Sequence, residues 1–226
     1  MKRETLQRIV RWGIKNLTIS EFIGLENVPA SGGIIAATNH MSRIDIPLLF
    51  TLPVRPDITA LVTDKYQSYP FFKWFTITAG GIWIDRTKAD FTAFRLAAEV
   101  IAAGRALGIA PEGTRSDGEL LEGKSGTVLL ALKTGAPVIP VGISGTDTVN
   151  DEWKHLRKPH LAVRIGAPLT FAPLERDRRD TQLQDYTTEV MCQIAALLPE
   201  KYHGFYRGHP RLKEILASQA EVYNPA

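Results

Sequence analysis

Residues 33–47 read GIIAATNHMSRIDIP. Small and apolar residues open this stretch, as is typical of a strand that is covered on both faces. The polar residues that follow include His40 and Asp45, which flank four residues. In a continuous helix such a spacing rotates by roughly 140°, so the two side chains would point apart. A helix cap at Ser42 or Asp45, with Pro47 in the first turn, predicts instead a bend that brings them together.

The bend predicts that the carboxylate of Asp45 holds one ring nitrogen of His40. Such a pairing fixes the tautomer of the imidazole and stabilises the imidazolium that forms when the ring takes a proton. We therefore interpret His40 as a general base for a hydroxyl group. A structural alternative stays open at this spacing, in which Asp45 only caps a helix and the backbone satisfies His40.

The strand in this stretch is one of several short apolar runs that alternate with amphipathic segments. The alternation predicts an α/β fold, with one domain and a mostly parallel central sheet flanked by helices. The expected strands are Gly33 to Thr38, Ile58 to Val62, Ile82 to Ile84, Leu107 to Ala110, Val138 to Ile143 and Leu161 to Ile165. The expected helices are Thr5 to Asn16, Ile46 to Thr51, Lys88 to Ala103, Ser125 to Thr134, Thr181 to Leu198 and a short one near Leu212 to Ala220.

Composition agrees with one folded domain, which we expect at residues 19–200, between a first helix at 1–18 and a C-terminal extension at 201–226. The 226 residues are 44% hydrophobic and 23% charged, which excludes wholesale disorder and a coiled coil. A single cysteine, Cys192, excludes an internal disulfide and fits a reducing compartment. The net charge of +3 is too small to predict a nucleic-acid partner.

The first segment of the chain is amphipathic and basic. Its apolar face is predicted to hold Leu6, Ile9, Val10, Ile14 and Leu17. Residues 1–16 carry five basic side chains against Glu4, a net charge of 5 − 1 = +4. Such a helix with Trp12 can lie in a membrane interface, or it can pack on the sheet with a solvated basic face. No apolar run is long enough to span a bilayer, so we expect a cytoplasmic chain, free or peripheral on the cytoplasmic side of a membrane.

A second group of polar residues follows the expected strand at Leu107 to Ala110. The turn Glu112-Gly113-Thr114-Arg115-Ser116 offers backbone N–H groups, hydroxyls and a guanidinium. That set suits a phosphate monoester, because a guanidinium pairs with phosphate in a bidentate way. Arg86, at the end of another short strand, is predicted to face the same phosphate. Pro140 lies within an apolar strand, where a proline predicts an edge position or a bulge.

These segments, in this order, resemble the motifs of the glycerolipid acyltransferase family, whose best-known members are 1-acylglycerol-3-phosphate acyltransferases. The first motif, N-H-x-S-x-x-D, is matched by Asn39, His40, Ser42 and Asp45. The second is matched by Gly80, Ile82, Ile84, Asp85 and Arg86, with Trp83 at the usual aromatic position. The third, E-G-T-R-S, is matched at 112–116, and the fourth, V-P-V, around Pro140 with Ile139 as its first residue. The segment from Lys65 to Phe72 is similar to a lysine-to-proline stretch of the family.

The resemblance implies a glycerol-3-phosphate acyltransferase-like fold and an O-acyltransferase. His40 would deprotonate the hydroxyl of a lysophospholipid, and Asp45 would orient His40. Arg115 with Gly113 and Thr114 would hold the phosphate of that lipid, helped by Arg86 and Lys65. Glu112 belongs to the same turn and is expected to brace it as a hydrogen-bond acceptor.

The implied co-substrate is acyl-CoA or an acyl carrier protein, and no metal or other cofactor is expected. The favoured acyl acceptor is 1-acylglycerol 3-phosphate, and glycerol 3-phosphate is the next. An aromatic cluster of Phe71, Phe72, Trp74 and Phe75 has two interpretations, core packing or a wall of an acyl channel.

Other functional classes compete with this one. Residues Gly118–Ser125 match the phosphate-loop pattern G-x-x-x-x-G-K-S and are followed by an expected helix, which suggests a nucleotide hydrolase. Glu119 and Glu122 within that loop would repel phosphate. A hydrolase using Ser, His and Asp is a third class, weakened by the lack of G-x-S-x-G. A non-catalytic protein of the membrane surface is a fourth.

Overall fold

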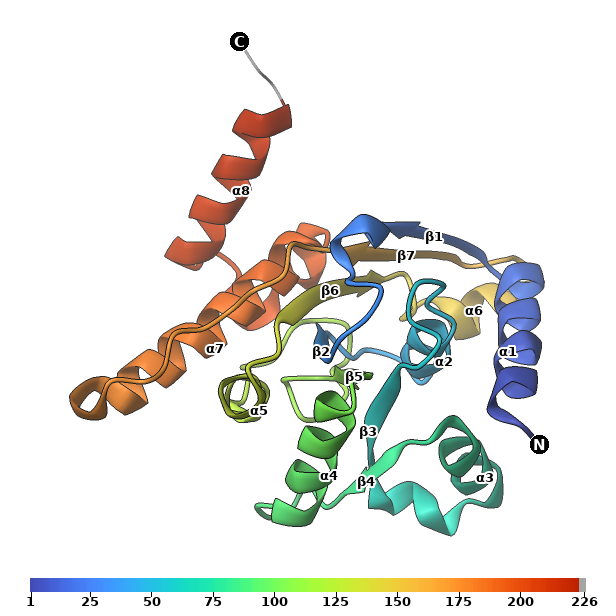
Figure 1. Ribbon diagram of the computed structural model, residues 1–226. Coiled ribbons are helices and arrows are strands. Elements are labelled where there is room, and N and C mark those ends of the chain that lie inside the picture. The colour runs from blue at the N-terminus through green and yellow to red at the C-terminus, as the bar shows by residue number, and fades with distance from the viewer. Residues whose placement is uncertain (224–226) are drawn as a thin grey trace.

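A seven-stranded sheet forms the centre of the computed structural model, which describes residues 1–223 (Figure 1). The strands are β1 (Ile19–Ile23), β2 (Ile34–Thr38), β3 (Thr59–Thr63), β4 (Ile82–Ile84), β5 (Ala106–Ile109), β6 (Val138–Ser144) and β7 (His160–Ile165). Their order in the sheet is β1-β7-β6-β2-β5-β3-β4. Every neighbouring pair is parallel except β6 with β7. The predicted α/β fold with a mostly parallel sheet is confirmed.

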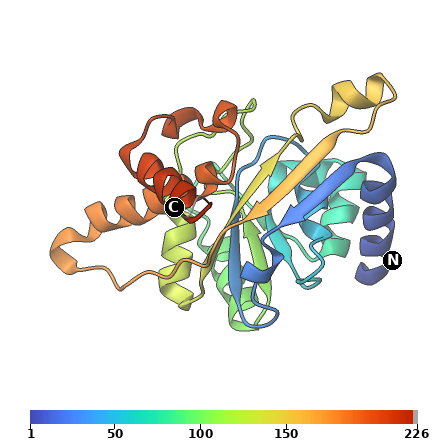
Figure 2. The same cartoon turned by 90° about the horizontal axis from the view of Figure 1, so that it is seen from above.

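Helices cover both faces of this sheet. They are α1 (Arg3–Leu17), α2 (Asp45–Phe50), α3 (Pro70–Ala79), α4 (Phe91–Ala102), α5 (Gly126–Thr134), α6 (Val149–Lys154), α7 (Arg179–Ala196) and α8 (Pro210–Tyr223), with short 3₁₀ helices η1 (Leu25–Asn27), η2 (Asp64–Ser68), η3 (Arg176–Arg178), η4 (Glu200–Tyr202) and η5 (Gly204–Tyr206). Figure 2 shows α7 and α8 on one side of the sheet and α1 on the other. None of the helices in residues 1–223 has the length and apolar character that crossing a bilayer requires. The last three residues of the expected C-terminal extension, 224–226, lie outside the described part.

Strand β2 divides the core into two layers. Ile35 and Ala37 face the cluster that contains residues of α4, α5 and α7, whereas Ile34 and Ala36 face the cluster that contains residues of α1 and α2. All five residues of the strand are buried. The absence of a polar face explains why the sequence shows a continuous apolar run here.

Each expected strand matches an observed one to within one residue at either end. One strand, β1, and two α-helices, α3 and α6, were not expected from the sequence, nor were the short 3₁₀ helices. The helix expected at Lys88 to Ala103 begins at Phe91 instead, because the side chain of Asp90 caps it by accepting a hydrogen bond from Ala93 N at 2.9 Å.

The predicted edge position of Pro140 is wrong, since β6 lies between β7 and β2. Pro140 sits where the pairing with β7 ends, and its carbonyl accepts a hydrogen bond from Gly166 N at 2.9 Å. Two residues further back, Val138 pairs with Leu169, which is three residues beyond Gly166. Two residues on one side of the pairing therefore correspond to three on the other, which is a bulge. The missing N–H of Pro140 falls at this bulge, where the regular ladder between β6 and β7 has ended.

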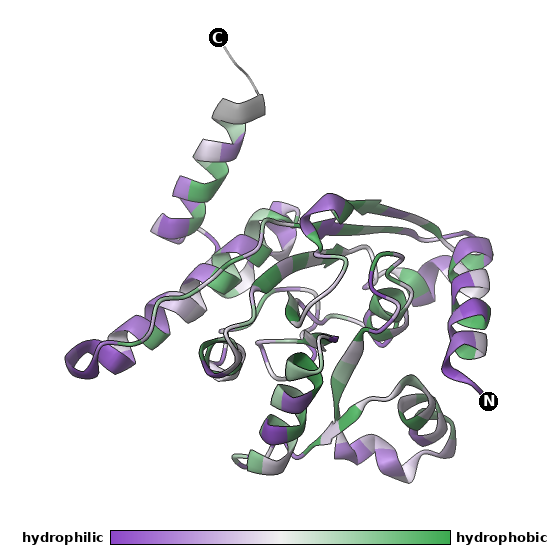
Figure 3. Cartoon of the chain, in the orientation of Figure 1, coloured by the Kyte–Doolittle hydropathy of each residue, from purple (hydrophilic) through white to green (hydrophobic). Residues whose placement is uncertain are grey.

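Helix α1 packs on the domain through part of its predicted apolar face. Leu6 and Ile14 are buried, while Ile9 and Leu17 are about half exposed and Trp12 is 67% exposed. The outward side of the helix therefore combines basic residues with a large aromatic ring. Figure 3 shows hydrophilic residues alternating with hydrophobic ones along α1. Packing on the domain and an outward basic, aromatic face are both present, so the two alternatives for this helix are compatible.

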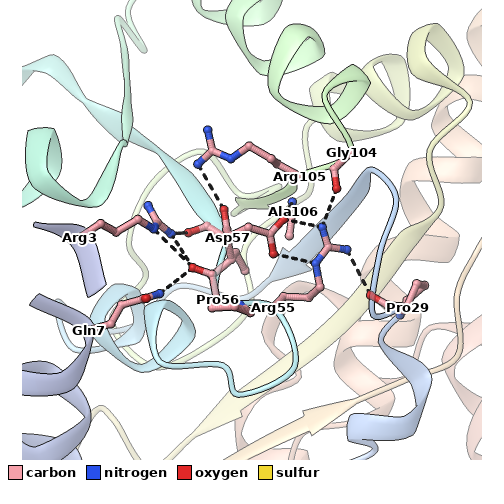
Figure 4. Close-up of polar contacts among 10 residues, drawn as sticks. Arg3, Gln7, Pro29, Arg55, Pro56, Asp57, Gly104, Arg105 and Ala106 are labelled. Carbon is pink, nitrogen blue, oxygen red and sulfur yellow. Dashed lines mark hydrogen bonds and ion pairs between the residues drawn. The ribbon is translucent and has the colours of Figure 1, made fainter. Parts of the chain in front are cut away.

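A buried arginine fastens the segment between α2 and β3. Arg55 is 1% exposed and donates two hydrogen bonds to the carboxylate of Asp57, at 2.8 and 2.7 Å (Figure 4). Its remaining donors reach the carbonyls of Pro29 and Gly104 at 3.2 and 3.0 Å. Asp57 also accepts from Ala106 N at 3.1 Å, which ties this segment to the start of β5.

The same segment anchors α1. Gln7 donates to the carbonyl of Pro56 at 2.7 Å, and Arg3 donates to the same carbonyl (Figure 4). Arg3 also donates to the carbonyls of Ile58 and Ala79. These bonds connect the first helix to β3 and α3. The side chain of Val10, one turn further along α1, is thereby held against the domain.

Removal of the Asp57 carboxylate should destabilise the fold in a pH-dependent way. The Arg55 hydrogen bonds lower the pKa of Asp57 to about 2. A lowered folded-state pKa contributes stability above the ordinary value of 3.8, and that stability is lost as the pH falls toward 2. We expect Asp57→Asn to cost about 3 kcal/mol at neutral pH, because it leaves a buried guanidinium without its partner. Urea unfolding between neutral pH and pH 2 would measure it.

Asp85→Asn is the matched control, since Asp85 pairs with the exposed Lys88 and should contribute far less. A wild-type advantage over Asp57→Asn that stays constant down to pH 2 would contradict the assignment.

Candidate active site

Four of the predicted functional segments end at the same edge of the sheet. Strands β2, β5, β3 and β4 are parallel neighbours in that order, so their carboxyl ends lie side by side. His40 follows β2, Glu112 follows β5, Lys65 follows β3 and Arg86 follows β4. Ligands of open α/β sheets bind at this edge.

His40 and Asp45 meet as the spacing predicts. Nδ1 of His40 lies 2.9 Å from Oδ2 of Asp45, and the same oxygen accepts from the backbone N–H groups of Met41 and Ser42 at 2.9 and 2.8 Å. Asp45 is 1% exposed and stands at the first residue of α2, so it folds the preceding turn around its own carboxylate. An ionised carboxylate only accepts, so Nδ1 carries the proton and Nε2 is left as the basic nitrogen.

Two further residues of this motif support the turn. The amide of Asn39 is buried and exchanges two hydrogen bonds with the backbone of Ile143 in β6, at 2.8 and 2.7 Å. Ser42 contributes its backbone N–H to Asp45 and its hydroxyl to a long 3.5 Å contact with Ile44 N. Asn39 therefore joins the end of β2 to β6, and Ser42 closes the turn.

Glu112 braces the end of β2 from the opposite side. Its side chain is 2% exposed, with Oε1 accepting from His40 N at 2.9 Å and Oε2 accepting from Leu121 N at 2.9 Å. Burial, together with the nearby charge of Asp45, raises the pKa of Glu112 to about 7 despite these two bonds. Both oxygens are engaged by the backbone, so Glu112 braces the turn and does not extend toward a phosphate.

Cationic side chains gather at the E-G-T-R-S turn. Gly113 has φ +72°, and a Cβ there would lie 3.1 Å from Nζ of Lys124, so the lysine side chain lies across this glycine. Partial burial lowers the pKa of Arg86, and the positive charge of Arg115 acts in the same direction. Within residues 1–223, none of Arg86, Arg115 and Lys124 forms an ion pair. Such a group of unneutralised cations suits an anion.

The remaining predicted residues of the phosphate site are less engaged. Thr114 is exposed in the turn beside Arg115. Lys65 is exposed in η2, and its ammonium has no hydrogen bond or ion pair with a described residue. Nothing in residues 1–223 links Lys65 to the other cations. No cluster of three His, Cys, Asp or Glu residues suited to a metal ion occurs in that range.

An apolar cavity of about 270 Å³ opens beside His40. Aromatic residues of α3 form one wall, and α1 and α2 contribute Val10, Pro47 and Phe50. Two glycines, Gly81 just before β4 and Gly108 in β5, also line the cavity. Phe71, Phe72 and Phe75 line the cavity, but Trp74 does not and is 41% exposed. The volume is close to the lower limit of common ligand sites, about 300 Å³.

The phosphate-loop pattern at Gly118–Ser125 does not form a phosphate cradle. A nucleotide loop needs free backbone N–H groups. Here the N–H groups of Leu120, Leu121, Gly123 and Lys124 all donate to protein atoms, at 2.8–3.0 Å. The hydrolase alternative also lacks support, because no serine hydroxyl within residues 1–223 hydrogen-bonds to His40.

Two cationic residues of this region, Lys124 and Arg43, were not among the predicted site residues. Lys124 was considered only as part of the nucleotide loop, since the pattern of letters does not reveal that its neighbours' N–H groups are occupied. Arg43 lines the apolar cavity and lies over the ring of Phe72, with 5.7 Å from its guanidinium carbon to the ring centroid. The location of Arg43 within the first motif, between His40 and Asp45, was the sequence feature that could have indicated it.

The fold and the sequence are similar to those of known acyltransferases. The chain is 32% identical over 127 residues to 1-acyl-sn-glycerol-3-phosphate acyltransferase from Borreliella burgdorferi, covering 55% of this chain and 50% of that protein. It is 31% identical over 186 residues to the protein of that name from Saccharomyces cerevisiae, covering 79% of this chain and 59% of the other. The chain thus spans between half and three fifths of the length of these relatives.

A solved structure agrees with this likeness. The crystal structure of the 1-acyl-sn-glycerophosphate (LPA) acyltransferase PlsC from Thermotoga maritima superimposes with a TM-score of 0.63 at 26% identity, over 83% of this chain and 76% of that one. Residues 19–144 match the family described as Acyltransferase. This range is more than half of the sequence and contains His40, Asp45 and the E-G-T-R-S turn, and the chain therefore belongs to the acyltransferase family.

Proposed function

We propose that this chain transfers a fatty acyl group from an acyl thioester to the hydroxyl of a lysophospholipid, with 1-acylglycerol 3-phosphate as the favoured acyl acceptor. One observation carries the proposal: the His40–Asp45 pair borders an apolar cavity and shares its edge of the sheet with a group of unpaired cations. A hydrocarbon chain fits the apolar cavity, and a phosphate fits the group of cations. Glycerol 3-phosphate is the alternative acyl acceptor.

In the proposed reaction His40 is the general base. Nε2 takes the proton of the lysolipid hydroxyl while its oxygen attacks the thioester carbonyl carbon. The new C–O ester bond forms, the C–S bond breaks, and the thiolate takes the proton back from the imidazolium. The products are a diacyl phospholipid and free CoA or free acyl carrier protein. Asp45 stabilises the imidazolium, and no acyl-enzyme, metal or further cofactor enters this scheme.

The apolar cavity is the proposed site for an acyl chain. Its lining brings together aromatic rings of α3 and aliphatic residues of α1, α2 and β3. His40 is the one imidazole in this lining, so a thioester held at the mouth would lie beside the base. Positioning of the two reactants supplies much of the rate in such a reaction.

The proposed phosphate site consists of Arg115, Arg86 and Lys124 around the glycine turn. The absence of ion-pair partners for all three within residues 1–223 supports it, because such cations bind an anion without first breaking an internal bridge. Thr114 can add a hydroxyl. Lys65 remains part of the proposal only as an exposed residue at the same edge of the sheet.

Peripheral attachment to the cytoplasmic side of a membrane is proposed for α1. Its outward face carries Arg8, Arg11, Lys15 and the 67% exposed Trp12, and its inward face fixes it to the domain. A lipid substrate enters from a bilayer, so a basic, aromatic surface on this domain favours delivery there.

His40→Ala should reduce acyl transfer by about 10²–10⁴-fold, because it removes the proton acceptor. The measurement is thiol release from acyl-CoA with a panel of lysolipids. His155→Ala, which changes an exposed histidine at the end of α6, is the matched control. Near-normal turnover by a folded His40→Ala protein would refute the base, and wild-type protein that transfers no acyl group to any lysolipid would refute the proposed function.

Arg115→Gln and Lys124→Met should each raise KM for 1-acylglycerol 3-phosphate about tenfold, the loss expected for one charge-assisted hydrogen bond. KM for acyl-CoA should change little, and a phosphate-free lysolipid should be unaffected. Lys133→Met, at an exposed position near the other end of α5, is the control. If the phosphate-free lysolipid suffers equally, these residues do not bind the phosphate.

The triple change Arg8→Gln, Arg11→Gln and Lys15→Gln should weaken binding to anionic phospholipid vesicles, by about 1 kcal/mol for each charge at low salt. Vesicle sedimentation measures the effect. The control triple Arg176→Gln, Arg178→Gln and Arg179→Gln removes the same charge from exposed positions around η3. Equal losses from the two triples would show that net charge, rather than α1, governs the binding.

A further inference from the structure

We propose that the C-terminal strap, defined as residues 199–209, positions the acyl-acceptor side of the active site through the hydroxyl of Tyr206. The inference rests on the proposed function and concerns a segment beyond residues 19–144, the range that matches the family. In Figure 2 the strap lies in the red part of the chain, beside the green loop that follows β5. Tyr206 is a positioning residue, because it acts through that loop.

The strap holds the loop at residues 117–124 by backbone and side-chain bonds. Leu120 N donates to Tyr202 O, and Phe205 N donates to Leu120 O, both at 2.9 Å. Gly123 N donates to Oη of Tyr206 at 3.0 Å. The loop has no helix or strand of its own, so these contacts replace the ladder that would otherwise fix it.

The close approach of strap and loop depends on Gly204. Its φ is +48°, and a Cβ at this position would collide with the backbone N and O of Leu120. Tyr206 is 1% exposed, with its ring in the core cluster. The hydroxyl of Tyr206 is buried and the N–H of Gly123 is partly buried, so the bond between them is costly to leave unmade.

From the loop, two hydrogen bonds lead into the active site. Leu121 N donates to Oε2 of Glu112, whose other oxygen holds the backbone N of His40. Lys124 N donates to Pro111 O at 2.8 Å, which sets the lysine side chain across Gly113. Gly123, the residue that Tyr206 holds, lies between these two donors. The strap therefore controls the brace of His40 and the placement of Lys124 together.

A matched pair of variants separates positioning from general stability. Tyr206→Phe removes the hydroxyl that binds Gly123 N. Tyr202→Phe removes an equally buried hydroxyl of the same strap, which binds Asp147 Oδ1 and Gly145 N beyond β6 and leaves the Tyr202 carbonyl bond to Leu120 intact. Both variants keep the aromatic ring, so both should fold.

The measurements are kcat, KM for each substrate and the melting temperature. Tyr206→Phe should lower kcat by about tenfold or more and raise KM for 1-acylglycerol 3-phosphate, because small displacements of reacting groups are costly in rate. KM for acyl-CoA should stay within about twofold, since the strap does not line the apolar cavity. Tyr202→Phe should lower the melting temperature comparably while leaving kcat and both KM values near those of the wild type.

Two results would overturn the inference: a Tyr206→Phe protein with wild-type kcat and lysolipid KM, or equal kinetic losses in the two variants. Either result would leave the proposed function standing if the wild type transfers acyl groups and His40→Ala does not. A wild type without acyl transfer would instead remove the proposed function.

Discussion

Two buried carboxylates hold the end of β2, and the rest of the candidate site depends on them. Asp45 accepts hydrogen bonds from the imidazole of His40 and from two backbone N–H groups after it, and Glu112 accepts from the backbone N of His40 itself. Backbone donors at the end of a buried strand must find partners. The same bonds that satisfy this requirement also fix the position and the tautomer of the histidine. The geometry of the site is therefore a consequence of how the backbone is hydrogen-bonded at the end of β2.

The two carboxyl groups, Asp45 and Glu112, differ in their hydrogen-bond partners and in the effect of burial. Asp45 gathers three donors on one oxygen, whereas burial of Glu112 outweighs its two backbone bonds and raises its pKa to about 7. Near neutral pH the carboxyl of Glu112 is therefore partly protonated, which limits the negative charge that the turn presents. Unpaired cations lie across Gly113 and at the end of β4. At this edge of the sheet, two buried carboxyl groups hold the backbone and unpaired cations surround the glycine turn.

The sequence predicted the elements whose pattern is local. Buried strands such as β2 are continuous apolar runs, and the bend between His40 and Asp45 follows from the failure of a straight helix to join them. Strand β1 was missed because it is an edge strand with no buried residue, and α3 because its ten residues are mostly aromatic and apolar rather than periodic. Lys124 was considered only within the competing nucleotide-loop pattern, because the sequence does not show which backbone N–H groups are already hydrogen-bonded.

The C-terminal strap accounts for the hydrogen bonds made by several backbone N–H groups of the loop at 117–124. The loop at 117–124 joins β5 to α5 and carries glycines that allow many conformations, so its own sequence does not determine where Leu121 and Lys124 lie. The strap removes this freedom, because Leu120 is bonded on both its N–H and its carbonyl. The imidazole of His40 is oriented by its own turn, through the carboxylate of Asp45. A cationic site built on a loop needs a second segment, and here that segment comes from the far end of the chain.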